Sequence, residues 1–250
     1  MTKTAPSLHR VVFILFAMLS LIAMAGTGGC KRDPATLKQK ALENGNREYD
    51  RGKYPEAIIY YGQALQIDRH FAEAHYKLAQ CYLKQGSFAA AFQELARTVD
   101  LQPDNMPAQL NLGQLLLRGG KGKEAKERAL LILRSDPKNI DARILLAGAD
   151  VELGDKEALQ EAQETARMAP DRPDVYMQIA LIQAKNGAWS ESETNLKKAA
   201  SLDSKSVGAL MTLGSFYEQR RRWPEALEQF NSAIARDPKN PAPRAAVATV

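Results

Sequence analysis

Apolar residues recur through most of the chain at the three- and four-residue spacing of an amphipathic helix. The clearest example is the segment 207–240, in which Leu210 and Leu213 share one face of a predicted first helix. After a short turn, Phe230 and Ile234 share one face of a predicted second helix. Two such helices cannot bury both of their apolar faces alone, so the segment requires similar neighbours along the chain.

The same pattern occurs upstream about every 34 residues, which predicts a linear array of helix pairs. The fourth repeat is one residue short, near Gly154. A polar linker, 30–37, precedes the array, and we expect Thr36 to cap the first helix. Residues 241–250 are expected to form either the start of a seventh first helix or a C-terminal tail. The six repeats have the bounds 38–71, 72–105, 106–139, 140–172, 173–206 and 207–240.

Two positions in every repeat hold a small residue. Small residues that face each other allow two helix axes to approach closely, so these positions predict where paired helices cross. The position in the first helices is occupied by Gly45, Ala79, Gly113, Ala147, Ala180 and Gly214. The position in the second helices is occupied by Ala57, Ala91, Ala125, Ala158, Ser192 and Ala226. We expect larger side chains such as Tyr61, Leu95, Leu196 and Phe230 to pack around these crossings.

The turns between paired helices carry glycine, as a left-handed helix stop requires. The sixth repeat has Arg221 at this place, at a cost of about 1 kcal/mol if its backbone is left-handed. We expect Asn105, Asn139 and Asn240 to cap the first helices that follow them. The glycines are Gly52, Gly86, Gly120, Gly154 and Gly187.

The sixth repeat resembles the tetratricopeptide repeat (TPR), whose succession of Leu-Gly, Tyr, Ala, Phe and Pro matches Leu213-Gly214, Tyr217, Ala226, Phe230 and Pro238. The resemblance implies an all-α fold, a right-handed α–α superhelix (solenoid) whose first helices line a concave groove. Two repeats depart from the others at the start of the second helix. They have Gly122 and Lys156 where the remaining repeats have Tyr54, Phe88, Trp189 and Trp223.

The same resemblance indicates which first-helix residues face the groove. One column is apolar or aromatic, and beside it lies a column of carboxamides, which both donate to and accept from an extended backbone. Such a groove suits a peptide or helix with apolar anchors, although the same columns also serve helix packing. The basic residues of the peptide-carboxylate clamp are absent from these positions, so that activity is excluded. The predicted groove residues are Leu42, Asn46, Tyr49, Tyr76, Gln80, Leu83, Leu110, Gln114, Leu117, Ile144, Met177 and Met211.

The first thirty residues have the pattern of an export signal. Lys3 and Arg10 precede the apolar run 11–25, which is short for a bilayer span. Cleavage after Ala25 would give a secreted or periplasmic protein with a free thiol, and an uncleaved anchor is a further alternative. The stretch before Cys30 instead resembles a bacterial lipobox, although it has threonine where leucine is usual. Under that reading 1–29 is a lipoprotein signal peptide and Cys30 carries the lipid.

Lys31, rather than aspartate, follows Cys30, which favours an outer-membrane lipoprotein whose repeats face the periplasm. The formal net charge of +5 is mild and does not indicate nucleic acid. Cys81 is expected to be a small buried residue, and His70 and His75 to lie on the surface. The run 220–222 is expected to be a solvated turn, and the glycine-rich segment at 119–123 lacks the spacing of a phosphate loop.

No motif places a catalytic group, a metal site, a cofactor or a small-molecule substrate. The sequence therefore favours a non-catalytic scaffold of the bacterial envelope that binds a protein or peptide. Its resemblance to TPR lipoproteins of the envelope implies a role in the assembly of pili, outer-membrane proteins or an exopolysaccharide export system. An alternative is the substrate-recruiting arm of a longer enzyme, a glycosyltransferase or protease, whose catalytic part lies beyond residue 250. A second alternative is a purely structural spacer.

Overall fold

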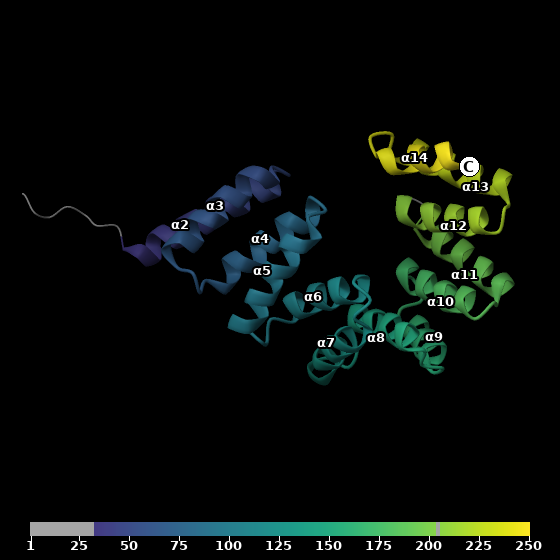
Figure 1. The fold of residues 1–250 in the computed structure, drawn as a ribbon, viewed down its shortest axis with the longest axis horizontal. Coiled ribbons are helices and arrows are strands. Elements are labelled where there is room, and N and C mark those ends of the chain that lie inside the picture. The colour runs from purple at the N-terminus through teal and green to yellow at the C-terminus, as the bar shows by residue number, and fades with distance from the viewer. Residues whose placement is uncertain (1–32, 204–205) are drawn as a thin grey trace, which may run out of the picture. The chain divides into compact units, whose positions relative to one another are not determined.

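The computed structural model describes residues 33–203 and 206–250, and within these ranges every regular element is an α-helix (Figure 1). The predicted all-α fold built from successive helix pairs is therefore confirmed. The helices are α2 (Pro34–Asp50), α3 (Tyr54–Ile67), α4 (Ala72–Lys84), α5 (Phe88–Leu101), α6 (Met106–Arg118), α7 (Gly122–Ser135), α8 (Ile140–Leu153), α9 (Ala158–Met168), α10 (Pro173–Lys185), α11 (Trp189–Leu202), α12 (Val207–Gln219), α13 (Trp223–Arg236) and α14 (Pro241–Thr249).

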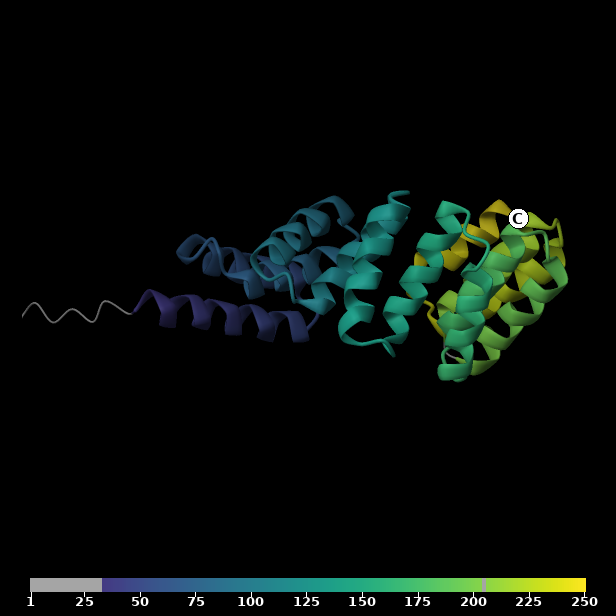
Figure 2. The ribbon, with the colours of Figure 1, turned by 90° about the horizontal axis from the view of Figure 1, so that it is seen from below.

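The described chain forms two compact parts. The N-terminal part ends at Phe71 and contains α2 and α3, which pack against each other. The C-terminal part, Ala72–Val250, contains α4 to α14, and each of its helices packs against the next one along the chain (Figures 1 and 2). The first helices α6, α8, α10 and α12 also contact one another in that order. The C-terminal part is thus a stack of helix pairs in which the first helices α6, α8, α10 and α12 form one row.

The first helix of the N-terminal part begins earlier than the sequence pattern predicts. Helix α2 starts at Pro34, inside the segment expected to be a linker, because proline suits the first turn of a helix. The side chain of Asp33 accepts a hydrogen bond from the backbone N–H of Ala35 over 3.4 Å. The prediction that Thr36 caps this helix is therefore wrong, since Thr36 lies within the helix.

The predicted helix crossings are confirmed, because the small residues of both columns are buried in all six repeats. The fit is closest where glycine faces a ring. A Cβ atom added to Gly214 would lie 2.4 Å from Cε1 of Phe230, and one added to Gly45 would lie 2.4 Å from Cε1 of Tyr61. Both rings are fully buried. The first and sixth helix pairs are therefore each held by an aromatic ring that lies against a position with no side chain.

Caps and turns also follow the sequence. Asn105, Asn139 and Asn240 cap α6, α8 and α14, and Ser206 caps α12 in the same way. The five turn glycines have φ between 71° and 79°, and Arg221 has φ of 56° at the corresponding place. Arg221 is thus a non-glycine residue in the left-handed region, which meets the condition for the cost of about 1 kcal/mol.

Replacing Arg221 by glycine should increase the free energy of unfolding by about 1 kcal/mol, because glycine lacks the Cβ that makes this conformation costly. Urea unfolding measures the change. Arg220→Gly is the matched control, since Arg220 has a φ of −90° and its guanidinium lies 4.6 Å from the Trp189 ring centroid. The control should lose stability, and a loss for both variants would contradict the strain at Arg221.

Candidate partner-binding face

The predicted apolar column of the first helices is partly exposed throughout the C-terminal part. Tyr76 on α4 and Leu110 on α6 pack against one core cluster and keep part of their surface open. Ile144 on α8 packs against a second cluster, and Met177 and Met211 on α10 and α12 pack against a third. Each side chain is therefore held in place by the core while it offers apolar surface. We call this set, together with the carboxamides beside it, the first-helix face.

Polar groups lie next to the apolar column at its start. Asn111 donates from Nδ2 to the hydroxyl oxygen of Tyr76 over 3.5 Å. Burial raises the pKa of the Tyr76 phenol, although hydrogen bonds with Gln80 and Asn111 oppose the shift. Gln80 is partly exposed and Gln114 is exposed. Their exposure leaves these two carboxamides accessible, and their contact with a partner backbone stays a prediction.

The carboxamide column ends at Gly148, and the structure gives the reason. Leu117 packs so closely on α8 that its Cδ2 atom would lie 2.7 Å from a Cβ added to Gly148. Leu117 therefore joins α6 to α8 while it stays partly exposed, and Leu83 on α4 is also partly exposed. A side chain at position 148 would therefore require Leu117 to move.

The three predicted groove residues of the N-terminal part have other roles. Leu42 is only 1% exposed, so the prediction that it contacts a partner is wrong. It shares the buried face of α2 with Ala41 and Gly45, which follow the three-residue spacing. Asn46 accepts a hydrogen bond from the hydroxyl of Tyr61 over 2.8 Å, which ties it to α3. Tyr49 is partly exposed and stacks edge-on against Tyr54, with 5.4 Å between the ring centroids.

Sequence comparison identifies the family. Three family models match, described as TPR repeat over residues 45–86 and as tetratricopeptide repeat over 82–147 and 177–241. Together they cover well over half of the chain. The chain is a tetratricopeptide repeat protein.

The relatives of this TPR protein share only part of their length with it. It is 27% identical over 201 residues to the protein named DnaJ homolog subfamily C member 3 from Gallus gallus, an alignment that covers 72% of this chain and 39% of the relative. It is 28% identical over 136 residues to human sperm-associated antigen 1, covering 54% of this chain and 15% of that protein. The chain thus spans about two fifths of the first relative and less of the second.

Solved structures of TPR proteins have the same fold. A tetratricopeptide repeat protein from Parabacteroides merdae superposes with a TM-score of 0.74 at 17% identity, covering 91% of this chain and 88% of that one. The pilF protein of Pseudomonas aeruginosa superposes with a TM-score of 0.57 at 16% identity, covering 87% and 99%. At these identities the similarity establishes the fold alone.

The described residues contain neither a membrane-spanning helix nor a cluster of metal ligands. No helix in them combines the length and the apolar character needed to cross a bilayer, and the apolar run 11–25 and Cys30 lie outside them. No group of three or more His, Cys, Asp or Glu side chains within the same residues is arranged to hold a metal ion.

One histidine of this TPR protein does not lie where the sequence suggests. His75 is buried, and its Nδ1 lies 2.5 Å from Oε2 of Glu94 on the partner helix, so the prediction of a surface residue is wrong for His75. His70 is exposed, as predicted. The next repeat has the same arrangement, because Arg128 donates to Oε1 of Gln109 over 3.0 Å. In each of these two pairs the partners are 19 residues apart, and the second pair occupies the same positions one repeat later. This repeated polar spacing is the sequence signal that could have revealed both links.

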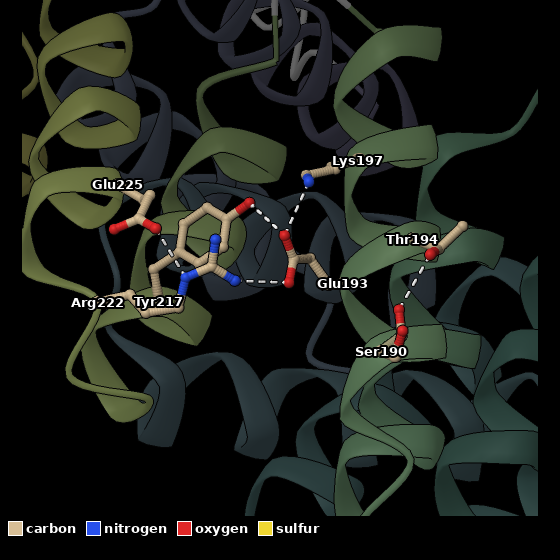
Figure 3. A network of polar contacts seen from close by, with 7 residues as sticks. All are labelled: Ser190, Glu193, Thr194, Lys197, Tyr217, Arg222 and Glu225. Atoms are coloured by element: carbon tan, nitrogen blue, oxygen red, sulfur yellow. Dashed lines mark hydrogen bonds and ion pairs between the residues drawn. The ribbon is translucent and has the colours of Figure 1, made fainter.

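The basic run 220–222 is less solvated than predicted. Arg222 lies 2.7 Å from Glu193 and 2.8 Å from Glu225, and its guanidinium covers the ring of Tyr217 (Figure 3). Lys197 and the Tyr217 hydroxyl also bond to Glu193, over 2.7 Å and 3.0 Å. Burial opposes ionisation of Glu193, but these bonds outweigh it and lower the pKa of its carboxyl. The network joins α11, α12 and α13, so it is structural, and only Arg220 and Arg221 are exposed.

A second charged cluster lies between the third and fourth repeats. Nζ of Lys126 is 2.6 Å from Oδ1 of Asp150 and 3.6 Å from Oδ2 of Asp155, and Asp150 is 3% exposed. The hydrogen bond with Asp150 raises the pKa of Lys126. Glu161 on α9 is partly buried nearby. Its own desolvation and the charge of Asp150 raise the pKa of Glu161 above the ordinary 4.5, although Lys126 opposes the shift.

This shift predicts how stability depends on pH. A carboxyl whose folded pKa is raised stabilises the fold below about pH 4.5, and that contribution is lost as the pH rises through the raised value. Glu161→Gln should therefore gain stability relative to the wild type between pH 4 and pH 7. Urea unfolding at several pH values measures the difference. Glu164→Gln, at an exposed position of the same helix, is the control, and equal pH slopes for wild type and Glu161→Gln would contradict the prediction.

Proposed function

We propose that this TPR protein is a non-catalytic scaffold of the bacterial envelope that holds an extended protein segment on its first-helix face. The observation that carries the proposal is the row of apolar side chains on α4, α6, α8, α10 and α12, each anchored in the core and partly exposed. A row of this kind accepts alternate side chains of an extended segment, while Gln80 and Gln114 bond to its backbone.

The proposed location is the periplasmic side of the outer membrane, with the lipid on Cys30 as the anchor. The support comes from the sequence: a basic start, a short apolar run, and small residues directly before Cys30. Lys31 after Cys30 supports the outer rather than the inner membrane. The partner is a protein or peptide of an envelope assembly, for which the row provides apolar contacts.

A pair of matched substitutions tests the binding face. Leu110 on α6 and Leu130 on α7 are both partly accessible leucines, but only Leu110 belongs to the first-helix face. Under the proposal, Leu110→Glu abolishes capture of envelope proteins by the purified chain, whereas Leu130→Glu does not. Circular dichroism confirms that both variants stay folded. Equal capture by both variants would contradict a role for the first-helix face.

Counting thiols in the native mature protein tests the processing of the N-terminus. Cys81 is fully buried, and burial raises the pKa of its thiol to about 11, so it should not react with a thiol reagent at pH 8. A lipidated Cys30 has no free thiol, which gives a count of zero. One reactive thiol, together with an intact mass that starts at Gly26, would overturn lipidation and support the secreted alternative.

A further inference from the structure

A cavity of about 300 Å³ lies where the fourth repeat meets the fifth. Val151, Leu159 and Ile182 supply its apolar lining, from α8, α9 and α10. Asp155 and Lys156, in the α8–α9 turn, and Lys185, at the end of α10, supply its charged lining. None of these residues belongs to the first-helix face.

The corresponding junction between the fifth and sixth repeats has an aromatic ring at this position. There Trp189 begins α11, its ring centroid 6.4 Å from that of Phe216, and the Arg220 guanidinium lies 4.6 Å from the indole centroid. Phe88 at the start of α5 lies under Arg118 in the same way, at 4.6 Å. The chain thus repeats one arrangement, in which a ring at the start of a second helix lies beneath a cation from the following first helix.

The fourth repeat has the site without the ring. Lys156 is the counterpart of Trp189, and Ile182 is the counterpart of Phe216. The cavity beside Trp189, of about 240 Å³, has the indole as a wall, whereas no aromatic residue lines the cavity beside Lys156. The cavity beside Lys156 therefore lies where other repeats have an aromatic ring, and no ring of this chain lines it.

The third repeat also lacks the ring, yet there the space is closed. A Cβ added to Gly122 would lie 3.0 Å from Cβ of Glu152 and 3.4 Å from the backbone oxygen of Ala149. The helices approach each other at this glycine, so no room remains for a side chain. The open cavity beside Lys156 is therefore not a necessary result of losing the aromatic residue.

The charged lining residues are two lysines and one aspartate, a balance that favours an acidic residue beside the aromatic side chain that would fill the cavity. Lys185 donates to the backbone oxygen of Val151. Asp155 is engaged by the backbone N–H of Glu157 and by Lys126. Within the described residues Lys156 is exposed and forms no hydrogen bond or ion pair, so its cation is available.

We propose that this cavity binds an aromatic side chain of a partner protein, flanked by an acidic residue that pairs with Lys156. The partner would supply the ring that the fourth repeat lacks, over Ile182 and beside the two lysines. This contact lies outside the first-helix face and does not depend on the function proposed above.

The test uses the full mature protein and the blocked peptide acetyl-Asp-Trp-Asp-amide. Methyl NMR should show concentration-dependent shifts at Val151, Leu159 and Ile182, and the alanine peptide acetyl-Asp-Ala-Asp-amide should bind at least about tenfold more weakly. Lys156→Trp should abolish peptide binding, because the new indole fills the cavity from within. It should also raise the Tm by about 2–4 °C.

Two controls make the test decisive. Lys138→Trp places an indole at an exposed position in a different turn and should leave both peptide binding and the Tm unchanged. Lys156→Gln keeps the cavity, removes its free cation, and should weaken binding several-fold. The proposal is overturned if both peptides shift the three methyl groups equally, or if binding survives in Lys156→Trp. A peptide that shifts only methyl groups outside the cavity also overturns it.

Discussion

Phe230→Ala is expected to reduce the free energy of unfolding by about 3–5 kcal/mol, the largest effect of any substitution considered. The Phe230 ring extends from α13, is fully buried and lies against Gly214 of α12, so its removal leaves a cavity that the helices cannot easily close. Urea unfolding measures the loss. Phe88→Ala is the control, because Phe88 is 41% exposed and should lose no more than about 1 kcal/mol.

Substitutions at Gly214 test the packing of the Phe230 ring independently. Gly214→Ala alone should destabilise by about 1–3 kcal/mol, since its Cβ would lie 2.4 Å from the Phe230 ring. In the Phe230→Ala background the same change should cost far less, because the ring is absent. Gly208→Ala, in the same helix with no atom closer than 3.6 Å to the new Cβ, should not destabilise. Additive losses for Gly214 and Phe230 would show that the two positions do not pack against each other.

Lys126→Met is expected to destabilise the protein by about 3 kcal/mol. It leaves the carboxylate of Asp150, only 3% exposed, without its cation at 2.6 Å. The estimate is at the low end for a buried pair, because the Lys126 side chain is 33% exposed and water screens part of the interaction.

The double variant Lys126→Met/Asp150→Leu separates the two sources of that loss. Replacing both partners with apolar residues should restore most of the stability, because no buried charge is then left unpaired. Thermal and urea unfolding of the three variants provides the comparison. A loss below about 1 kcal/mol for Lys126→Met would mean that the pair behaves like an ordinary surface ion pair.

The sequence predicted the elements that depend on local rules. Glycine turns, asparagine caps and the crossings of small with large residues each follow from backbone geometry within one repeat. Arg221 is the exception, and its place in a left-handed turn could be recognised because the corresponding residues of the other five repeats are glycines. Repetition strengthened the prediction of the helix crossings, because a position that holds a small residue in all six repeats is stronger evidence than any single residue.

The sequence did not predict contacts that depend on what lies across a helix pair. Leu42 has the register of a groove residue, yet it is buried with Ala41 and Gly45 on α2. His75 looked like an isolated surface histidine because its partner, Glu94, is on another helix. The cavity beside Lys156 could not be predicted either, because Gly122 in the third repeat shows that a missing ring can also lead to a closed junction.

The measurement that tests the account most directly is photo-crosslinking in intact cells. A photoreactive residue is placed at Gln80 or Gln114 on the first helices and, in separate variants, at Glu127 or Gln163, which are exposed on second helices. If the first-helix face holds the partner, a discrete adduct forms from positions 80 and 114 and not from 127 and 163. Adducts that form only from the second-helix positions would contradict the central claim.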